Sequence, residues 1–404
     1  MNLIKDGLQN KTVIRTSLTR KLTIDGMTNP YPVYKIRLDQ LFYNDQNDRI
    51  ATWISEYRVQ HDGQMPDMND QEVYNSIIEQ FIVESNPDAI RKTQNNIELV
   101  DQREPGIVLA DGRIIDGNRR FTCLRKLAPK GERFAYFEAV ILDRDIERSA
   151  KAIKMLELAI QHGEESKVDY NPIDRLVGVY NDLIETKLLS EEEYARATNE
   201  SLSDVRKRME LARLMIEFLA FIHAPKQFFI ARDMQIYSPL NELSLMLKKC
   251  SSAEEAEKVK TAVFSNILMQ TSTDLVRYIR NFKSIIGSDY EDEFLKEQCA
   301  VADKVIGAIP HVEQMDTAVV RDMIRTNDEL AEELDNSVEK TLLKIRKTET
   351  RNRPIQQAEK ATAFLEDIDV HIIDKMNDSE LRRFARQLNK LKGLVAELEG
   401  KLQI

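Results

Sequence analysis

The sequence is poor in the residues that interrupt helices. Of its 404 residues, 13 are glycine and 11 are proline, together about 6% against the ~12% usual for globular proteins. This shortage excludes a low-complexity or disordered chain and predicts long helices with few tight turns. Four of the glycines (Gly106, Gly112, Gly117 and Gly131) fall within one short stretch. We therefore expect unusual backbone conformations there and helices elsewhere.

Cysteine, long apolar runs and positive charge are also scarce. The three cysteines are far apart and form no Cys-x-x-Cys pair, which predicts free thiols in a reducing compartment. The longest apolar run, 214–222, contains Glu217 and is far shorter than the ~20 residues of a membrane span. The polar N-terminus predicts no signal peptide. We expect a soluble, cytoplasmic protein. Because the net charge is −10, any nucleic-acid site must be a local basic patch.

The residue pattern predicts an α+β region at the start and helices after it. Residues 1–30 are polar and predict irregular structure, and the alternation of 33–38 predicts a strand. Asp111-Gly112 between two short apolar runs predicts a hairpin, because Asp-Gly favours positive φ. Further predicted elements are helices over 48–57, 70–85, 87–95 and 121–127 and a strand over 136–142. We expect four domains, spanning residues 1–145, 146–224, 225–350 and 351–404.

Two short helices with a three-residue break follow the predicted sheet. Ser190 and Glu193 have capping-box spacing, residues 199–201 form the break, and a longer helix covers 202–219. This pattern predicts a helix-turn-helix, with an ordinary helical hairpin as the alternative. Its second helix carries Ser201, Ser203, Arg206, Lys207 and Arg208, which are the expected DNA contacts. The competing interpretation is a helical bundle without DNA contact.

The last part of the chain predicts a coiled coil. After an expected linker at 351–354, apolar residues recur at steps of three and four: Leu381, Phe384, Leu388, Leu391, Val395, Leu398 and Leu402. Such a seam is typical of coiled coils. It pairs either with a second copy, giving a homodimer, or with helices of its own chain.

The stretch from Ile114 to Leu127 contains the residues that predict an anion-binding site. Gly117 and Asn118 are followed by Arg119 and Arg120 at the start of a predicted helix. Free backbone N–H groups, the positive end of the helix dipole and two guanidinium groups would then meet at one point, which suits a phosphate. The alternative is that both arginines are surface or ion-paired residues.

Residues 33–215 resemble the ParB/sulfiredoxin-like fold followed by the ParB helix-turn-helix domain. Five segments in the family's order carry the resemblance. They are Ile36–Leu41 with Asn44 and Gln46–Arg49, Glu104–Val108, Ile115–Arg120 with Leu124 and Lys126, Asp169–Ile173, and Glu192–Ala195 through Val205. The resemblance implies a small mixed sheet with helices, then mostly helical domains that include a helix-turn-helix and a C-terminal coiled coil.

The same resemblance implies a nucleotide site. ParB proteins bind CTP with Mg²⁺, which switches a DNA-bound dimer into a sliding clamp. By position, Gly117, Asn118, Arg119 and Arg120 would hold the triphosphate. Thr122 is a nearby hydroxyl donor, and Arg49 contributes from the first element.

The sequence departs from the family at two points. Asn118 replaces the motif's glutamate, and neutral Gln161 stands where a magnesium ligand is expected, so Glu164 or Glu165 would substitute. With these departures, the sequence predicts either CTP or ATP as the nucleotide. It does not decide whether the protein is a weak NTPase.

The expected function is a nucleotide-dependent DNA-binding switch or clamp in partition, transcription regulation, mobile-element biology or phage defence. One alternative is a ParB-fold enzyme, a metal-dependent nuclease or a nucleotide-dependent kinase, with Asp111, Asp116 and Glu138 as candidate carboxylates. Another is an interaction protein with a degenerate nucleotide site. Sulfiredoxin chemistry is disfavoured, because Asn118 stands in the turn where that enzyme needs cysteine and Cys123 lies a turn into the helix.

Overall fold

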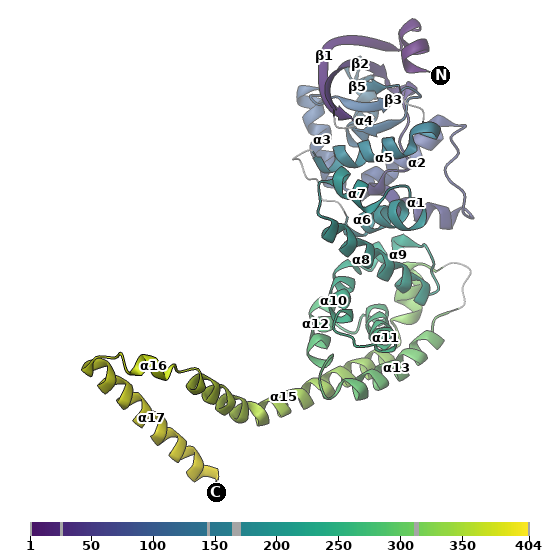
Figure 1. Cartoon of the computed structure of the whole chain (residues 1–404). Coiled ribbons are helices and arrows are strands. Elements are labelled where there is room, and N and C mark those ends of the chain that lie inside the picture. Colours follow the sequence, from purple (N-terminus) through teal and green to yellow (C-terminus); the bar gives the residue numbers. More distant parts are fainter. Residues whose placement is uncertain (1, 25–26, 144–145, 164–170, 311–314, 403–404) are drawn as a thin grey trace. The chain divides into compact units, whose positions relative to one another are not determined.

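The computed structural model describes residues 2–24, 27–143, 146–163, 171–310 and 315–402. The chain forms two compact units, Met1–Thr341 and Leu342–Ile404. Figure 1 shows the order of the elements along the chain. In the described part, no helix has the length and apolar content needed to cross a membrane.

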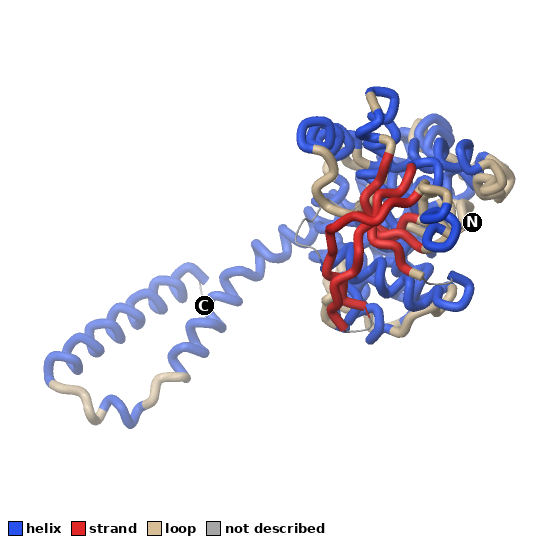
Figure 2. Tube along the Cα trace, turned by 90° about the horizontal axis from the view of Figure 1, so that it is seen from above, coloured by secondary structure: helices blue, strands red, loops and turns tan. Residues whose placement is uncertain are grey.

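A five-stranded mixed sheet forms the N-terminal part of the first unit. Its strands are β1 (Val13–Ile24), β2 (Met27–Arg37), β3 (Gly106–Leu109), β4 (Ile114–Asp116) and β5 (Tyr136–Leu142). They lie in the order β1-β2-β5-β3-β4. Neighbouring strands are antiparallel except β3 and β5, which are parallel. Figure 2 shows the strands together in the middle of this region.

Helices cover both faces of this sheet. On one face, Ile36, Val108 and Phe137 pack in a core with residues of α2 (Gln71–Ser85), α3 (Pro87–Val100) and α4 (Asn118–Leu127). On the other face, Val33, Ile107 and Val140 pack with residues of α5 (Ile146–Gly163). Helix α1 (Ala51–Gln60) follows the short turn η3 (Asp48–Ile50). Other short helical turns are η1 (Leu3–Gly7), η2 (Leu38–Gln40), η4 (Ala128–Lys130) and η5 (Glu132–Phe134).

The rest of the first unit is helical. Asn171 caps α6 ahead of Pro172, and Ser190 and Glu193 make both hydrogen bonds of the predicted capping box at α7. The elements are α6 (Pro172–Val179), η6 (Tyr180–Glu185), α7 (Glu191–Thr198), α8 (Leu202–Phe221), α9 (Phe228–Asp233), α10 (Tyr237–Leu247), α11 (Ala253–Met269), α12 (Leu275–Ile285), α13 (Glu291–Gly307), α14 (Thr317–Val319), η7 (Val320–Ile324) and the first part of α15 (Asp328–Glu366).

Two expectations about secondary structure are wrong. Residues 1–30 are not irregular: β1 and the start of β2 form a long hairpin there. Much of this hairpin is solvent-exposed. In β1 buried apolar residues alternate with exposed ones only at Leu22 and Ile24, which is too short a pattern to predict the strand. The linker expected at 351–354 is also absent, because α15 continues through Pro354.

The second unit consists of the end of α15, α16 (Val370–Ile373) and α17 (Asp378–Leu402). The predicted seam lies on α17, and none of that helix's residues is buried. Leu391 is 37% exposed and Leu402 is 65% exposed. The helix is confirmed, whereas its pairing with another chain stays a prediction.

Candidate functional site

A strand, a glycine turn and a helix form the centre of the site. Strand β4 ends at Asp116, and Gly117 has φ +100° as the N-cap of α4. A Cβ on Gly117 would lie 2.8 Å from Phe137 Cζ, so both the backbone and the space require glycine. The first N–H groups of a helix have no partner within it. Those of Asn118, Arg119 and Arg120 therefore point out of the turn at the positive end of the helix dipole.

This turn borders a cavity of about 330 Å³. Five of the predicted nucleotide-binding residues line it together: Arg49, Gly117, Asn118, Arg119 and Arg120. Arg49 lies on η3 and the other four lie at the start of α4. The fold thus brings residues about 70 positions apart in sequence to one cavity wall.

Arg119 carries an uncompensated positive charge in this cavity. Its side chain is half-buried and makes no hydrogen bond or ion pair with the described residues. Burial, followed by the nearby charge of Arg49, lowers the pKa of the Arg119 guanidinium. A desolvated cation without a partner is unfavourable on its own. An anion at this point would relieve that cost.

Asn118 is a second polar group in the cavity wall that lacks a partner. The residue is 9% exposed, and its Oδ1 atom is buried with no hydrogen-bond partner in the part of the chain that the structure describes. Buried polar atoms are nearly always hydrogen-bonded in folded proteins. An unsatisfied acceptor beside an unsatisfied cation suits a ligand that offers both negative charge and a hydrogen-bond donor.

Arg120 is engaged within the protein. It donates to Asp116 Oδ2 at 2.8 Å and to the Glu104 carbonyl oxygen at 2.9 Å. Arg20 on β1 donates to the same Asp116 oxygen at 3.1 Å. The carboxylate of Asp116 is therefore shared between two guanidinium groups, which fixes Arg120 at the edge of the cavity.

Thr122 does not line the cavity. It is fully buried in α4, and its hydroxyl shares a hydrogen bond of 2.8 Å with the Tyr43 hydroxyl. Cys123 beside it is also buried, and burial raises the pKa of its thiol to about 12. Such a thiol stays protonated near neutral pH, which does not fit a reactive cysteine.

Much of the cavity wall comes from residues that the sequence did not single out. Its apolar members are Ile82, Ile97, Ile115 and Ile160, and its polar members include Asn47, Asn86, Thr93, Asn96 and residues 101–104. The only local signal is the run of uncharged polar residues at 93–96 on α3. Its direction toward the cavity depends on the packing of α3 against α4 and could not be read from sequence.

A buried charge cluster lies next to Arg49. Lys154 of α5 contacts Asp48 at 2.7 Å and Asp182 at 3.4 Å. Burial and the neighbouring Asp48 raise the pKa of Asp182 to about 7, although Lys154 opposes this shift. Asp174 of α6 accepts a hydrogen bond from Thr52 N, and burial raises its pKa to about 7. This cluster joins the sheet region to the helices that follow it.

The expected DNA-contacting residues on α8 differ in availability. Arg206 pairs with Glu191 at 2.7 Å, and Arg208 pairs with Glu200, which also pairs with Arg175. Ser201 caps α8 by accepting from Asp204 N. Ser203 and Lys207 are exposed. The two arginines are therefore neutralised within the protein, while Lys207 is not.

The candidate metal ligands do not converge in the described residues. Glu164 and Glu165 lie outside the described part of the chain. Asp111 accepts from Arg113 N in its turn, and Glu138 lies 3.7 Å from Lys35. Within the described ranges, no group of three or more metal-ligating side chains was found.

Comparisons with known proteins give little. No protein-family model matches the chain, and no curated protein matches it. The chain is similar to a solved structure described as the C2221 form of a Pnob8-like ParB-N domain, with 13% identity over 68% of this chain and 98% of that one. The TM-score is 0.34, which is too low to support an inference about this chain.

Proposed function

We propose that this protein is a ParB-like, nucleoside-triphosphate-dependent DNA-binding protein. The nucleotide is CTP or ATP, bound with Mg²⁺ in the cavity at Gly117–Arg120. Binding there changes how the sheet region and helices α7 and α8 engage DNA. We further propose that the protein acts as a homodimer through α17.

The observation that carries the nucleotide assignment is the uncompensated charge of Arg119 at the N-terminus of α4. In the described part of the chain, three backbone N–H groups without helical partners, a helix dipole and a guanidinium without a hydrogen bond or ion pair all favour an anion at one point. The cavity volume of about 330 Å³ lies at the lower end of the ~300–1,000 Å³ usual for ligand pockets. It is adequate for a nucleotide that remains partly open to solvent.

The remaining wall suits the other parts of a nucleotide. Ile82, Ile97 and Ile160 offer an apolar surface for a base. The unsatisfied Oδ1 of Asn118 accepts from a ribose hydroxyl or an exocyclic amino group. Mg²⁺ is usually held by one or two carboxylates together with the phosphates themselves. The cavity wall also includes the carboxylates of Asp101 and Glu104, of which Asp101 lies 3.9 Å from Arg133 Nη1.

The DNA assignment is supported by the arrangement of α7 and α8 with a three-residue turn between them. Exposed Ser203 and Lys207 lie in the first turns of α8, where a recognition helix meets base edges. Arg206 and Arg208 reach DNA only by exchanging their acidic partners for phosphates. We therefore expect weaker DNA binding than the number of cations on α8 suggests.

The proposed function is tested by a thermal-shift screen of CTP, ATP, GTP and UTP with Mg²⁺, each with and without duplex DNA. We expect stabilisation by CTP or ATP and a different DNA affinity when that nucleotide is bound. Metal-dependent DNA cleavage, or phosphate release without DNA, would instead support the enzyme alternative. No stabilisation by any triphosphate would contradict the proposal.

A further inference from the structure

The β1–β2 hairpin is basic, although the whole chain is acidic. Between residues 8 and 37 the sequence has six lysines and arginines but a single acidic residue, Asp25. The chain as a whole has a net charge of −10. The hairpin therefore carries a local positive charge.

Part of this hairpin extends beyond the sheet as a two-stranded ribbon. Strand β5 pairs with β2 only over Val33–Arg37, whereas β1 pairs with β2 along the hairpin as far as Ile24 and Met27. Figure 2 shows two strands running past the others. Residues 19–24 and 27–32 thus have only each other as strand partners.

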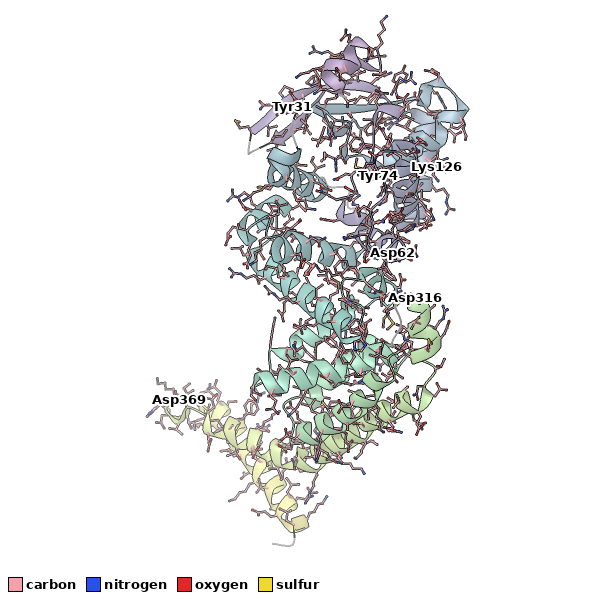
Figure 3. All side chains as sticks on the ribbon, turned by 90° about the vertical axis from the view of Figure 1, so that its right-hand side faces the viewer. Tyr31, Asp62, Tyr74, Lys126, Asp316 and Asp369 are labelled. Atoms are coloured by element: carbon pink, nitrogen blue, oxygen red, sulfur yellow. The ribbon has the colours of Figure 1, made fainter. Side chains whose placement is uncertain are left out.

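The two faces of the ribbon differ. Leu22 and Ile24 are 6% and 8% exposed and pack in the core shared with α5, together with Tyr31, which Figure 3 labels. Because side chains alternate along a strand and opposed residues share a face, the opposite face is set by the pairing. Within the ribbon it carries Thr19, Lys21, Thr23, Thr28, Pro30 and Pro32. Arg15, which pairs with Tyr34 where β2 also pairs with β5, lies on the same face of the hairpin nearer the sheet.

Two cationic side chains lie on this outward face. Arg15 and Lys21 are exposed, and neither side chain makes a hydrogen bond or ion pair with the described residues. Lys11, just before the strand, is likewise exposed and unpaired. Arg20 lies on the opposite face, where its bonds to Asp116 and to the Pro105 carbonyl oxygen anchor the ribbon to the glycine turn. The ribbon is thus fixed on one side and open on the other.

We propose that the outward face of this ribbon binds the sugar–phosphate backbone of duplex DNA. Unpaired cations gain most from phosphates, since counterions are released when they meet. The hydroxyls of Thr23 and Thr28 share one hydrogen bond of 2.7 Å, which uses only one of their two protons. The threonines of this face therefore still offer hydroxyl donors to phosphate oxygens. A two-stranded ribbon also has dimensions that fit a DNA groove. A lipid surface is disfavoured, because an interfacial element buries large apolar side chains and this face presents threonine and proline instead.

This contact is separate from the proposed use of α7 and α8 and does not depend on nucleotide. The test compares Arg15→Glu/Lys21→Glu with a matched control, Arg277→Glu/Lys296→Glu, in the full-length protein. Arg277 and Lys296 are also exposed and have no side-chain partner among the described residues. Both double variants change the net charge equally, and melting curves show whether each is folded.

The measurement is fluorescence anisotropy with duplex DNA over a series of salt concentrations, without nucleotide. We expect the hairpin variant to lose about tenfold or more in affinity and to lower the salt-dependence slope by about two, one for each lost phosphate contact. The control should stay within about twofold of wild type. Equal losses in both variants, or none in either, would overturn the proposal.

Two further arms separate this proposal from its alternatives. Binding to vesicles that contain phosphatidylserine, with no effect of the hairpin variant on DNA, would assign the face to lipid and overturn the proposal. Loss of DNA binding in Lys207→Glu but not in the hairpin variant would leave the proposed function of α8 standing and reject the ribbon. Loss in the hairpin variant with unchanged binding by Lys207→Glu would support the ribbon alone.

Discussion

The two regions that the sequence marks for anion binding use their arginines differently. At the start of α4, Arg119 is half-buried, and its side chain has no partner among the described residues. At the start of α8, Arg206 and Arg208 are paired with glutamates of their own chain. The charge of Arg119 is therefore uncompensated among the described residues, whereas the charges of Arg206 and Arg208 are already neutralised without a ligand. The number of cations in a motif therefore does not measure its capacity for anions.

The largest expected effect, on nucleotide affinity, comes from replacing an arginine of α4 by alanine. Arg119→Ala should lower nucleotide affinity about 100-fold or more, since it removes charge-assisted hydrogen bonds to phosphate. It should not destabilise the fold, because the Arg119 side chain has no partner to lose within the described ranges. Arg125 on the same helix pairs with Glu72 and Glu79 at 2.7 Å each. Arg125→Ala should cost about 1–3 kcal/mol of stability and leave nucleotide affinity unchanged.

Calorimetric titration and chemical denaturation measure these two effects separately. The comparison fails if Arg119→Ala destabilises the protein as much as Arg125→Ala does, because Arg119 would then have a structural partner. It also fails if nucleotide affinity falls equally in both variants.

The glycine turn gives the next largest effect. Gly117→Ala forces a left-handed backbone on a residue with a Cβ and brings that atom against Phe137. We expect a loss of about 2 kcal/mol in unfolding free energy together with weaker nucleotide binding. Gly307 in α13 is the control, because nothing lies within 4 Å of its added Cβ. Gly307→Ala should be neutral or slightly stabilising; equal losses would show that the turn does not require glycine.

The buried charge cluster that joins the sheet region to the helices after it should make the stability of the protein depend on pH. Asp174 has a pKa of about 7 in the folded protein because it is buried, against ~3.9 when unfolded. The folded state therefore binds this proton more tightly, and the unfolding free energy should fall as pH rises from 5 to 8. The expected fall from this group is on the order of 2 kcal/mol.

Asp174→Asn isolates this contribution. The amide oxygen still accepts from Thr52 N, and the side chain no longer ionises. Denaturation at several pH values should show a flatter stability profile in the variant than in wild type. An identical slope in both proteins would show that Asp174 does not titrate in this range.

The smallest effect is expected on α8, at Lys207. Arg208→Ala should cost about 1–3 kcal/mol of stability because it leaves Glu200 with one fewer partner. Lys207→Ala should stay within about 0.5 kcal/mol of wild type, as expected for an exposed side chain. Only Lys207→Ala should then weaken DNA binding without weakening the fold. Equal stability of the two variants would show that the Arg208–Glu200 pair contributes nothing.

Local signals predicted most of the elements near the site. Asp-Gly at 111–112 predicted the β3–β4 hairpin, Ser190 and Glu193 predicted the start of α7, and the run 136–142 predicted β5 with its observed bounds. These features depend on a few neighbouring residues. The hairpin of β1 and β2 was missed because most of its residues are exposed, and only at Leu22 and Ile24 do buried apolar residues of β1 alternate with exposed ones.

The partners of charged side chains were beyond sequence reasoning. Arg120 appeared equivalent to Arg119, yet Arg20, about 100 residues away, and Asp116 determine its surroundings. Thr122 lies two residues after Arg120 but points into the core toward Tyr43. Such distinctions arise from tertiary packing, because adjacent helix positions face different directions.

Hydrogen–deuterium exchange with and without the bound triphosphate tests the central claim most directly. A phosphate at the N-terminus of α4 should slow the exchange of the amides of Asn118, Arg119 and Arg120, which have no helical partner. In the absence of DNA, the amides at the start of α8 should not change. Nucleotide binding that protects other amides and leaves residues 118–120 unaffected would contradict this account.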